Sequence, residues 1–197
     1  MKIIVENYNS DWNKEFEQLK SQLLHLLGFL NPAIEHIGST SVNGLSAKPV
    51  IDILVGLNSE ADLDRTIEPM LRENFVYYAC YNEVMPYRRF FVKHRVNPKK
   101  LSVPQIISER DRIPATSEEI QQRLAHIHIL RVNSEHWLRH IAFREYLRAF
   151  PEIRTQYQQL KENLGEQDWK DGNDYNSAKN DFIKAEETNA LNWYKNR

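Results

Sequence analysis

Apolar residues recur at helical spacing near the start of the chain, at successive intervals of four, three, four and three. These residues are Trp12, Phe16, Leu19, Leu23 and Leu26. The spacing predicts an amphipathic helix that buries one face. Ser10 is the predicted N-cap, and Asp11 places a carboxylate at the positive end of the helix dipole.

Short apolar runs after this helix predict the strands of a sheet. They occupy residues 34–37, 50–55, 75–80, 87–93 and 124–130. The run from Val50 to Val55 is apolar on both faces except at Asp52, which is typical of a buried strand.

The remaining segments alternate between helical and irregular patterns. Residues 59–73 open with Ser59 and several acidic residues, which predicts a helix. Residues 96–116 contain three prolines and no sustained period, so we expect a long loop there. From residue 134 onward the pattern is helical, and the predicted helices cover residues 134–149, 151–165 and 178–193.

Composition excludes several classes of protein. The chain has 197 residues, a formal net charge of −1 and one cysteine, Cys80, which excludes an intramolecular disulfide. The small net charge argues against bulk nucleic-acid binding, which relies on a strongly basic surface. No apolar run is long enough to span a membrane. The N-terminal residues MKIIVENYN show no secretory pattern, so we expect a cytoplasmic location.

Candidate chemistry concentrates between residues 33 and 55. Gly38 permits a sharp turn that places Ser39, Thr40 and Ser41 at the start of the next segment. Backbone N–H groups and small hydroxyl side chains at such a turn form a concavity that binds anions. We therefore expect this turn to contact phosphate.

Asp52 is the one acidic position in the apolar strand that follows. A buried carboxylate costs free energy unless it is hydrogen-bonded, paired or coordinated to a cation. Pairing with a nearby cation such as Lys48 and coordination of a metal are both consistent with the sequence. The Gly-Ser turn upstream shifts the balance towards a metal.

The stretch EHIGSTSVNGLSAKPVIDI, residues 35–53, resembles the signature of the GrpB family, a branch of the nucleotidyltransferase-like superfamily. Further matching pieces follow in order along the chain: Trp12, Arg89-Phe90-Phe91, His126-Ile127-His128, Phe143-Arg144-Glu145-Tyr146-Leu147-Arg148 and Pro151. Related domains also occur fused to dephospho-coenzyme A kinases.

The resemblance implies an α+β fold, a mixed β-sheet packed with helices. Residues 1–132 would form a nucleotidyltransferase-like α/β core, and residues 133–197 a C-terminal helical segment packed on it as part of one unit. In such a fold the Gly-Ser turn faces the phosphates of a nucleoside triphosphate. Acidic residues on the adjacent strand hold Mg²⁺ or another divalent metal.

Two positions depart from this pattern. The minor one is Asn43, which stands where proline is expected in the turn, and the other lies on the strand that carries Asp52. Active members of the superfamily carry two carboxylates at alternate positions of the strand, so that both bind metal from one face. Here the alternate position is Leu54, and no acid stands on the later strand with His126 and His128. The departure argues against the usual two-metal route, unless an acid from elsewhere replaces the missing one; the candidates are Glu35, Glu83 and Glu109.

Basic residues cluster between Tyr87 and Lys100. Strand alternation places Arg89, Phe91 and Lys93 on one face. The family resemblance favours Arg89 and Lys93 as phosphate contacts, and arginine and lysine both suit that role. The alternative is an edge strand protected from aggregation by its charges.

His126 and His128 share one face of the strand predicted at residues 124–130. Two imidazoles on one side can bind a transition metal, or they can hydrogen-bond to neighbouring groups or to phosphate. The implied fold places this strand beside Asp52. A mixed metal site of Asp52, His126 and His128 is therefore a hypothesis.

Three basic residues of the C-terminal helices also match the family pattern: Arg144, Arg148 and Lys179. They can close the pocket over a substrate. As an alternative, they pair on the helix surface with Glu145, Glu152 or Asp181.

Two functions remain in view. One is a metal-dependent nucleotidyltransferase in which Gly38 and Ser39 hold phosphates, Asp52 is catalytic and coordinates Mg²⁺, and an acceptor hydroxyl attacks the α-phosphorus. The other is a non-catalytic nucleotide-binding or protein-interaction module of the same fold. The expected ligand in either case is a nucleotide or another phosphate-containing small molecule.

Overall fold

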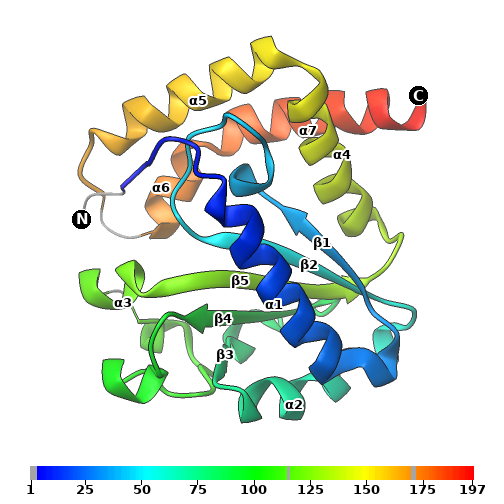
Figure 1. Cartoon of the computed structure of the whole chain (residues 1–197), viewed down its shortest axis with the longest axis vertical. Helices are drawn as coiled ribbons and strands as arrows, with labels where there is room; N and C mark the ends of the chain where they lie inside the picture. Colours follow the sequence, from blue (N-terminus) through cyan, green and yellow to red (C-terminus); the bar gives the residue numbers. More distant parts are fainter. Residues whose placement is uncertain (1–3, 115, 170–171) are drawn as a thin grey trace.

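A mixed five-stranded sheet organises the chain, with the strand order β1-β2-β5-β4-β3 (Figure 1). The structure is a computed structural model that describes residues 4–114, 116–169 and 172–197. Strands β2 and β5 run parallel, and the other neighbouring pairs run antiparallel. The strands are β1 (Ala33–Ile37), β2 (Ile51–Leu57), β3 (Phe75–Tyr77), β4 (Arg88–His94) and β5 (Arg123–Arg131).

The register of the parallel pair places Asp52 opposite His126 and Leu54 opposite His128. This confirms that the histidine strand lies beside Asp52. Because side chains alternate across a strand, Asp52, His126 and His128 all project from the same face of the sheet. Ile51, Ile53 and Ile127 project from the other face, into the main core.

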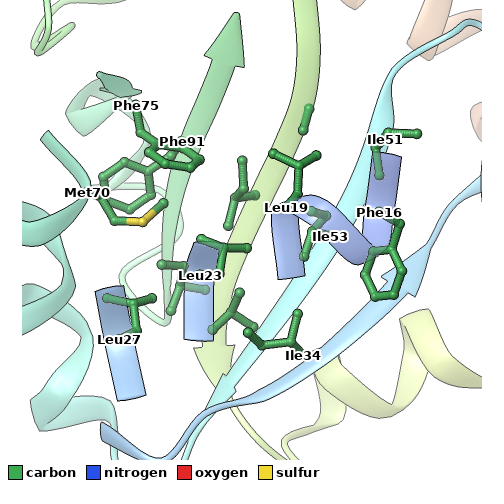
Figure 2. Close-up of a cluster of buried hydrophobic side chains, with 14 of the residues drawn as sticks. Phe16, Leu19, Leu23, Leu27, Ile34, Ile51, Ile53, Met70, Phe75 and Phe91 are labelled. Carbon is green, nitrogen blue, oxygen red and sulfur yellow. The ribbon is translucent and has the colours of Figure 1, made fainter. Parts of the chain in front are cut away.

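Helix α1 (Asp11–Leu27) covers that other face (Figures 1 and 2). Its apolar stripe is buried as the spacing predicts, and Leu23 and Leu27 lie against the strands without contact with solvent. Each such leucine contributes roughly 1.5–3 kcal/mol by its burial. The predicted cap is wrong in one detail: Ser10 makes no capping bond with its side chain, and Asn9 accepts the N–H of Asp11 at 2.9 Å instead.

The C-terminal helices lie on the side of the sheet that carries Asp52 (Figure 1). They are α4 (Glu135–Ala149), α5 (Pro151–Gly165), α6 (Gly172–Ala178) and α7 (Asn180–Lys195). Trp137 and Ile141 of α4 pack on Leu54 of β2. Val42 and Leu45, which follow the Gly-Ser turn, pack in a second cluster with residues of α4 and α5. These helices therefore anchor the connection between β1 and β2.

The shorter elements agree with the predicted pattern, with small differences. Residues 59–73 form a 3-10 helix, η3 (Glu60–Thr66), followed by α2 (Ile67–Arg72). Short helices also occur at η1 (Gly28–Leu30), η2 (Ser39–Ser41), η4 (Ala79–Tyr81), η5 (Pro98–Leu101), η6 (Arg110–Arg112) and α3 (Ser117–Gln121). The helix predicted from Ala178 to Trp193 is divided at Lys179, between α6 and α7.

Near the N-terminus, Glu6 forms a single β-bridge with Ala47, while residues 1–3 lie outside the described part. Within that part, none of the helices has the length and apolar character needed to cross a membrane.

Gly56 tests how tightly α4 packs on the sheet. A Cβ at this position would lie 2.6 Å from the Trp137 ring, so we expect Gly56→Ala to destabilise the protein by about 1–3 kcal/mol through overpacking. Urea unfolding measures the change. Gly28→Ala is the matched control, because a Cβ there meets no atom within 4 Å. Equal stabilities of the two variants would contradict this packing.

Candidate functional site

A cavity of about 590 Å³ lies on the face of the sheet that carries Asp52. Its floor comes from β2, β5 and β4 through Asp52, His126, His128, Arg88 and Phe90. One wall is the Gly-Ser turn after β1, and the C-terminal helices α5 and α6 close that side. The opposite wall carries aromatic residues that follow β3. The cavity therefore extends across three of the five strands, β2, β5 and β4.

The Gly-Ser turn lies directly on the carboxylate of Asp52. Gly38 has a φ of +70°, and a Cβ there would lie 2.4 Å from Asp52 Oδ2. Both the backbone conformation and this close approach require glycine. The Ser41 hydroxyl donates to the Gly38 carbonyl at 2.6 Å, and the Thr40 hydroxyl lies 3.0 Å from His36 Nε2. Gly38, Ser39 and Thr40 line the cavity, whereas Ser41 stabilises the turn from within.

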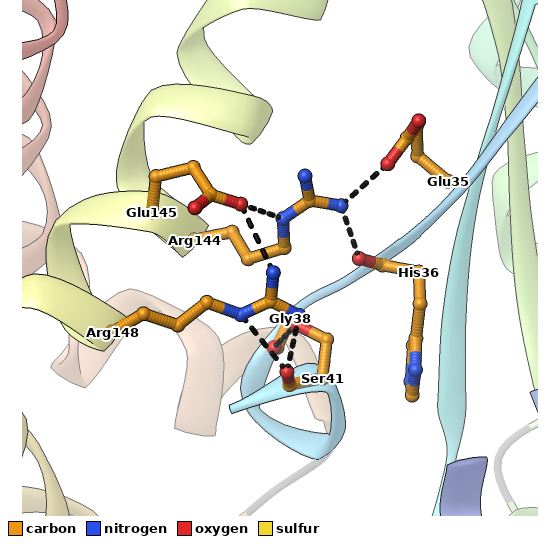
Figure 3. A network of polar contacts seen from close by, with 7 residues as sticks. All are labelled: Glu35, His36, Gly38, Ser41, Arg144, Glu145 and Arg148. Atoms are coloured by element: carbon orange, nitrogen blue, oxygen red, sulfur yellow. Dashed lines mark hydrogen bonds and ion pairs between the residues drawn. The ribbon is translucent and has the colours of Figure 1, made fainter. Parts of the chain in front are cut away.

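Arg144 and Arg148 of α4 hydrogen-bond to this turn and to strand β1 (Figure 3). Arg144 Nη1 donates to Glu35 Oε2 at 2.7 Å and to the His36 carbonyl at 2.8 Å. Arg148 Nη2 donates to the Ser41 carbonyl at 2.7 Å. Both guanidinium groups also bond to Glu145, and neither lines the cavity. Both arginines pair with Glu145, as the alternative predicted, and their bonds to backbone carbonyls stabilise the turn.

Arg89 and Lys93 also lie outside the cavity, contrary to the phosphate role predicted for them. Arg89 Nε donates to Asp64 Oδ1 at 2.6 Å, and Lys93 Nζ donates to the Glu73 carbonyl at 2.6 Å. The two do share a face, but it is the face covered by α1 and α2. Strand alternation instead turns Arg88 and Phe90 into the cavity.

Asp52 lies on the floor next to the Gly-Ser turn, with its side chain 32% exposed. Its Oδ1 is 3.2 Å from His126 Nδ1. Burial lowers the pKa of His126, and the Asp52 charge partly offsets the effect. His128 Nδ1 lies 3.1 Å from Arg88 Nη1, and burial together with that guanidinium holds the pKa of His128 well below its usual value. Both imidazoles are therefore neutral at pH 7.

The donor groups do not fit a resident metal site. Among residues 4–114, 116–169 and 172–197, no three side chains of His, Cys, Asp or Glu come together as metal ligands. His128 lies opposite Leu54 and faces a guanidinium, so it does not join Asp52 and His126. Two of the acids that could have replaced the missing carboxylate are paired elsewhere, Glu35 with Arg144 and Glu109 with Arg112.

Three lysines line the cavity: Lys48, Lys161 and Lys179. Lys161 of α5 is 3% exposed and donates to Ser39 Oγ at 3.1 Å and to the Ser46 carbonyl. Lys179 lies over the Tyr175 ring, with its Nζ 4.2 Å from the ring centre. Burial lowers the pKa of Lys161 to about 7, with a further contribution from the charge of Lys179. Burial also lowers the pKa of Lys48 and of Lys179 to about 8.

Aromatic side chains form the other end of the cavity. The rings of Tyr78 and Tyr81 are stacked with centres 6.1 Å apart, and Phe90 meets both edge-on. Beneath them, Arg123 bonds to Glu119 at 2.8 Å. Glu119 also lies 2.7 Å from His94, so this buried network fixes α3 and Arg123 to the sheet.

The sequence predicted most of the residues around the Gly-Ser turn and Asp52, but not all of the basic residues of the cavity. Gly38, Ser39, Thr40, Lys48, Asp52, Lys179 and both strand histidines line the cavity. Lys161 and Arg123 were missed. Lys161 stands four residues after Tyr157, on the buried face of a predicted amphipathic helix. A lysine on such a face was the available signal, because an unpaired buried charge is costly.

Comparisons with known proteins agree over nearly the whole chain. The family model described as GrpB protein matches residues 2–188. The glutamate-rich protein GrpB of Alkalihalophilus pseudofirmus is 29% identical over 181 residues, which cover 92% of this chain and 91% of that protein. The crystal structure of GrpB from Enterococcus faecalis has a TM-score of 0.75 and 32% identity, with 97% of this chain and 99% of that chain covered. The predicted mixed sheet packed with helices is thus confirmed.

A looser likeness is to a structure of the Cid1 poly(U) polymerase, with a TM-score of 0.47 and 10% identity over 80% of this chain and 45% of that chain. A likeness this loose does not bear on the chemistry of the cavity.

The buried lysine predicts a measurable effect on stability. Since the pKa of Lys161 is about 7 against 10.5 ordinarily, its charged form opposes folding at low pH, and the penalty fades as pH rises from 7 towards 10.5. We expect Lys161→Met to stabilise the protein by about 1–3 kcal/mol at pH 6, after allowance for the lost hydrogen bonds, and by less at pH 9. Urea unfolding at both pH values measures this.

Exposed Lys184 supplies the control for that comparison. Lys184→Met should change the free energy of unfolding by less than about 0.5 kcal/mol at either pH. A Lys161→Met effect that does not depend on pH would show that the lysine is not strained by its burial.

Proposed function

This chain belongs to the GrpB family, and from that premise we propose that it binds a phosphorylated small molecule of the nucleotide class in the cavity above β2 and β5. One observation carries the proposal: the charge of the cavity lining. Its basic residues are Lys48, Arg88, Arg110, Arg123, Lys161 and Lys179, and its one acidic residue within the described part is Asp52. Such a lining favours an anion with several charges.

The end of the cavity at the Gly-Ser turn, where Lys161 lies, suits phosphate groups in particular. Lysine provides a point charge with three donors, and the Ser39 hydroxyl adds a neutral partner beside Lys161. Lys48, Lys161 and Lys179 come from three different segments that line the cavity, and Lys161 contacts the turn through Ser39. A phosphate chain lying over the turn would therefore be contacted from several sides.

The aromatic end favours a nucleotide over bare phosphate. Bases stack on aromatic side chains in a way that tolerates different bases, and Tyr81 and Phe90 line the cavity there with their rings partly exposed. Strands lie about 4.8 Å apart, so β1 and β4 are separated by about 14 Å. That span suits a ligand with phosphates at one end and a flat ring at the other.

Nucleotidyl transfer is the second candidate, and the position of Asp52 favours it. The carboxylate lies against the Gly-Ser turn, beside a neutral histidine. In such a reaction an acceptor hydroxyl forms a bond to the α-phosphorus, the bond to pyrophosphate breaks, and Asp52 is placed to take the hydroxyl proton. Binding remains the better supported function, because Leu54 fills the place of a second carboxylate.

A thermal-shift screen tests the binding proposal. ATP, GTP, CTP, UTP and coenzyme A precursors are added with and without Mg²⁺. A ligand at about 100 times its Kd stabilises the native state by about 2.7 kcal/mol, and this corresponds to a Tm increase of roughly 5–10 °C for a chain of this size. We expect at least one nucleotide to give such a shift.

Charge reversal in the cavity supplies the matched pair of variants. Lys179→Glu should abolish the shift, whereas Lys184→Glu makes the same change of charge at an exposed position and should retain it. If both variants keep the shift, the nucleotide binds elsewhere. If no compound shifts the wild-type Tm, the cavity is not a nucleotide site.

Release of pyrophosphate separates the two candidate functions. A transferase should release it from a bound nucleoside triphosphate when an acceptor is present, and Asp52→Asn should reduce the rate by at least about 100-fold. A coupled assay for pyrophosphate measures this. Binding without release across a panel of hydroxyl acceptors would leave the non-catalytic function.

A further inference from the structure

The Gly-Ser end of the cavity offers a lysine where the superfamily pattern leads one to expect a metal. We propose that Lys161, Lys179 and Ser39 form a polyphosphate site that works without a divalent cation. This inference rests on the proposed function, since a phosphorylated ligand must first enter the cavity. It concerns how the phosphates of that ligand are neutralised.

Leu54 occupies the position where the superfamily pattern has a second carboxylate. A second metal-binding carboxylate would have to project from this position, but the leucine is fully buried beneath Trp137 and Ile141 of α4. An acid there would meet an apolar helix face. The packing of α4 on the sheet therefore removes the place for a second carboxylate. Asp52 remains as the one carboxylate of the described lining, which is the minimum that Mg²⁺ uses beside phosphates.

Asp52 already interacts with several basic groups of the protein. Its negative charge raises the pKa of Lys48 and of Lys179, in opposition to the effect of burial. It also lies 3.2 Å from His126 Nδ1. Asp52 therefore already serves as the counter-charge to basic groups of the protein. A divalent cation beside it would add to an excess of positive charge.

Lys161 is held in position by the segment between β1 and β2. Its ammonium group reaches from α5 to two points of this segment, where it donates to Ser39 Oγ and to the Ser46 carbonyl. An ammonium group has three donors. Among the residues that the structure describes, these two partners leave one N–H for a ligand at the turn. The side chain is thus held in place before any ligand arrives, which lowers the entropy cost of binding.

Lys161 and Lys179 repel each other in the free protein. The charge of Lys179 lowers the pKa of Lys161, and the other charged group that acts on Lys161 is Glu162 of its own helix, which raises it. Tyr157, Ser39 and the Ser46 carbonyl are its uncharged neighbours. A polyphosphate would stabilise both ammonium groups at once. Binding near pH 8 should therefore be accompanied by proton uptake.

Calorimetric titration with inorganic tripolyphosphate, and with the nucleotide found by the thermal-shift screen, tests the inference. Each is titrated at pH 7 in EDTA and again in Mg²⁺. We expect binding in EDTA for the wild type, and a loss of at least about tenfold in affinity for Lys161→Met, because a charged hydrogen bond contributes that much or more. Lys93→Met is the control, since Lys93 lies on the opposite face of the sheet and bonds to a backbone carbonyl.

Asp52→Asn distinguishes the lysine site from a metal site. Without a metal, removal of this negative charge should leave affinity unchanged or increase it. With a metal held by Asp52, the same variant should lose binding. At pH 8, the heat of binding to the wild type should vary with the ionisation enthalpy of the buffer, and this variation should decrease in Lys161→Met.

The failure of this inference differs from the failure of the proposed function. Nucleotide binding that requires Mg²⁺, or that is lost in Asp52→Asn, overturns the metal-independent site and leaves nucleotide binding intact. Equal affinities of Lys161→Met and the wild type also overturn it. Absence of binding under every condition overturns the proposed function, and the inference with it.

Discussion

The turn after β1 is in van der Waals contact with the carboxylate of Asp52, and the rest of the site is arranged around that contact. A side chain on Gly38 would overlap Asp52 Oδ2. Helix α4 holds the turn close to Asp52. Arg148 donates to the Ser41 carbonyl, and Arg144 donates to the His36 carbonyl. The same helix covers Leu54. The conformation of the turn, the exposure of Asp52 and the loss of the second carboxylate are thus consequences of how one helix packs.

The basic residues of the cavity show a conflict between stability and binding. Burial of Lys48, Lys161 and Lys179 is unfavourable in the free protein, and their lowered pKa values record this. Functional sites commonly retain strain of this kind because the ligand relieves it. Two arginines, one of them also in the cavity lining, have carboxylate partners instead. Arg123 has Glu119 as a partner, and Arg89 has Asp64.

Elements with strong local patterns were predictable from the sequence, and side-chain directions on a short strand were less so. The spacing of apolar residues predicted α1, and the run around Asp52 predicted β2, because burial of one face dictates both patterns. On β4, whether Arg88 or Arg89 enters the cavity depends on which face of the strand packs against the core. Both faces carry a phenylalanine and a cation, so the pattern is nearly symmetric. In the structure, Phe91 packs in the main core with residues of α1, so Arg89 lies on the same face as Phe91.

Contacts distant in sequence were the hardest to predict. Lys161 is separated from Ser39 by more than a hundred residues, and no local pattern states where α5 will lie. The resemblance to a family supplied the position of β5 beside β2, and the register then brought His126 to Asp52 as expected. It did not supply the role of Arg144 and Arg148. Those residues match the family signature, but they stabilise the turn instead of the ligand.

The parallel pairing of β2 with β5 also has a consequence for the order of events during synthesis. Asp52 and His126 are 74 positions apart, and the wall carrying Lys161, Tyr175 and Lys179 comes later still. Long-range pairing of this kind forms slowly, because loop closure precedes the contacts that reward it. A nascent chain that has already folded α1, β1 and β2 therefore has an open half-site that cannot retain an anion. If the cavity binds a ligand as proposed, capture would begin only when α5 and α6 have emerged and docked, and the binding-competent state would coincide with completion of the fold.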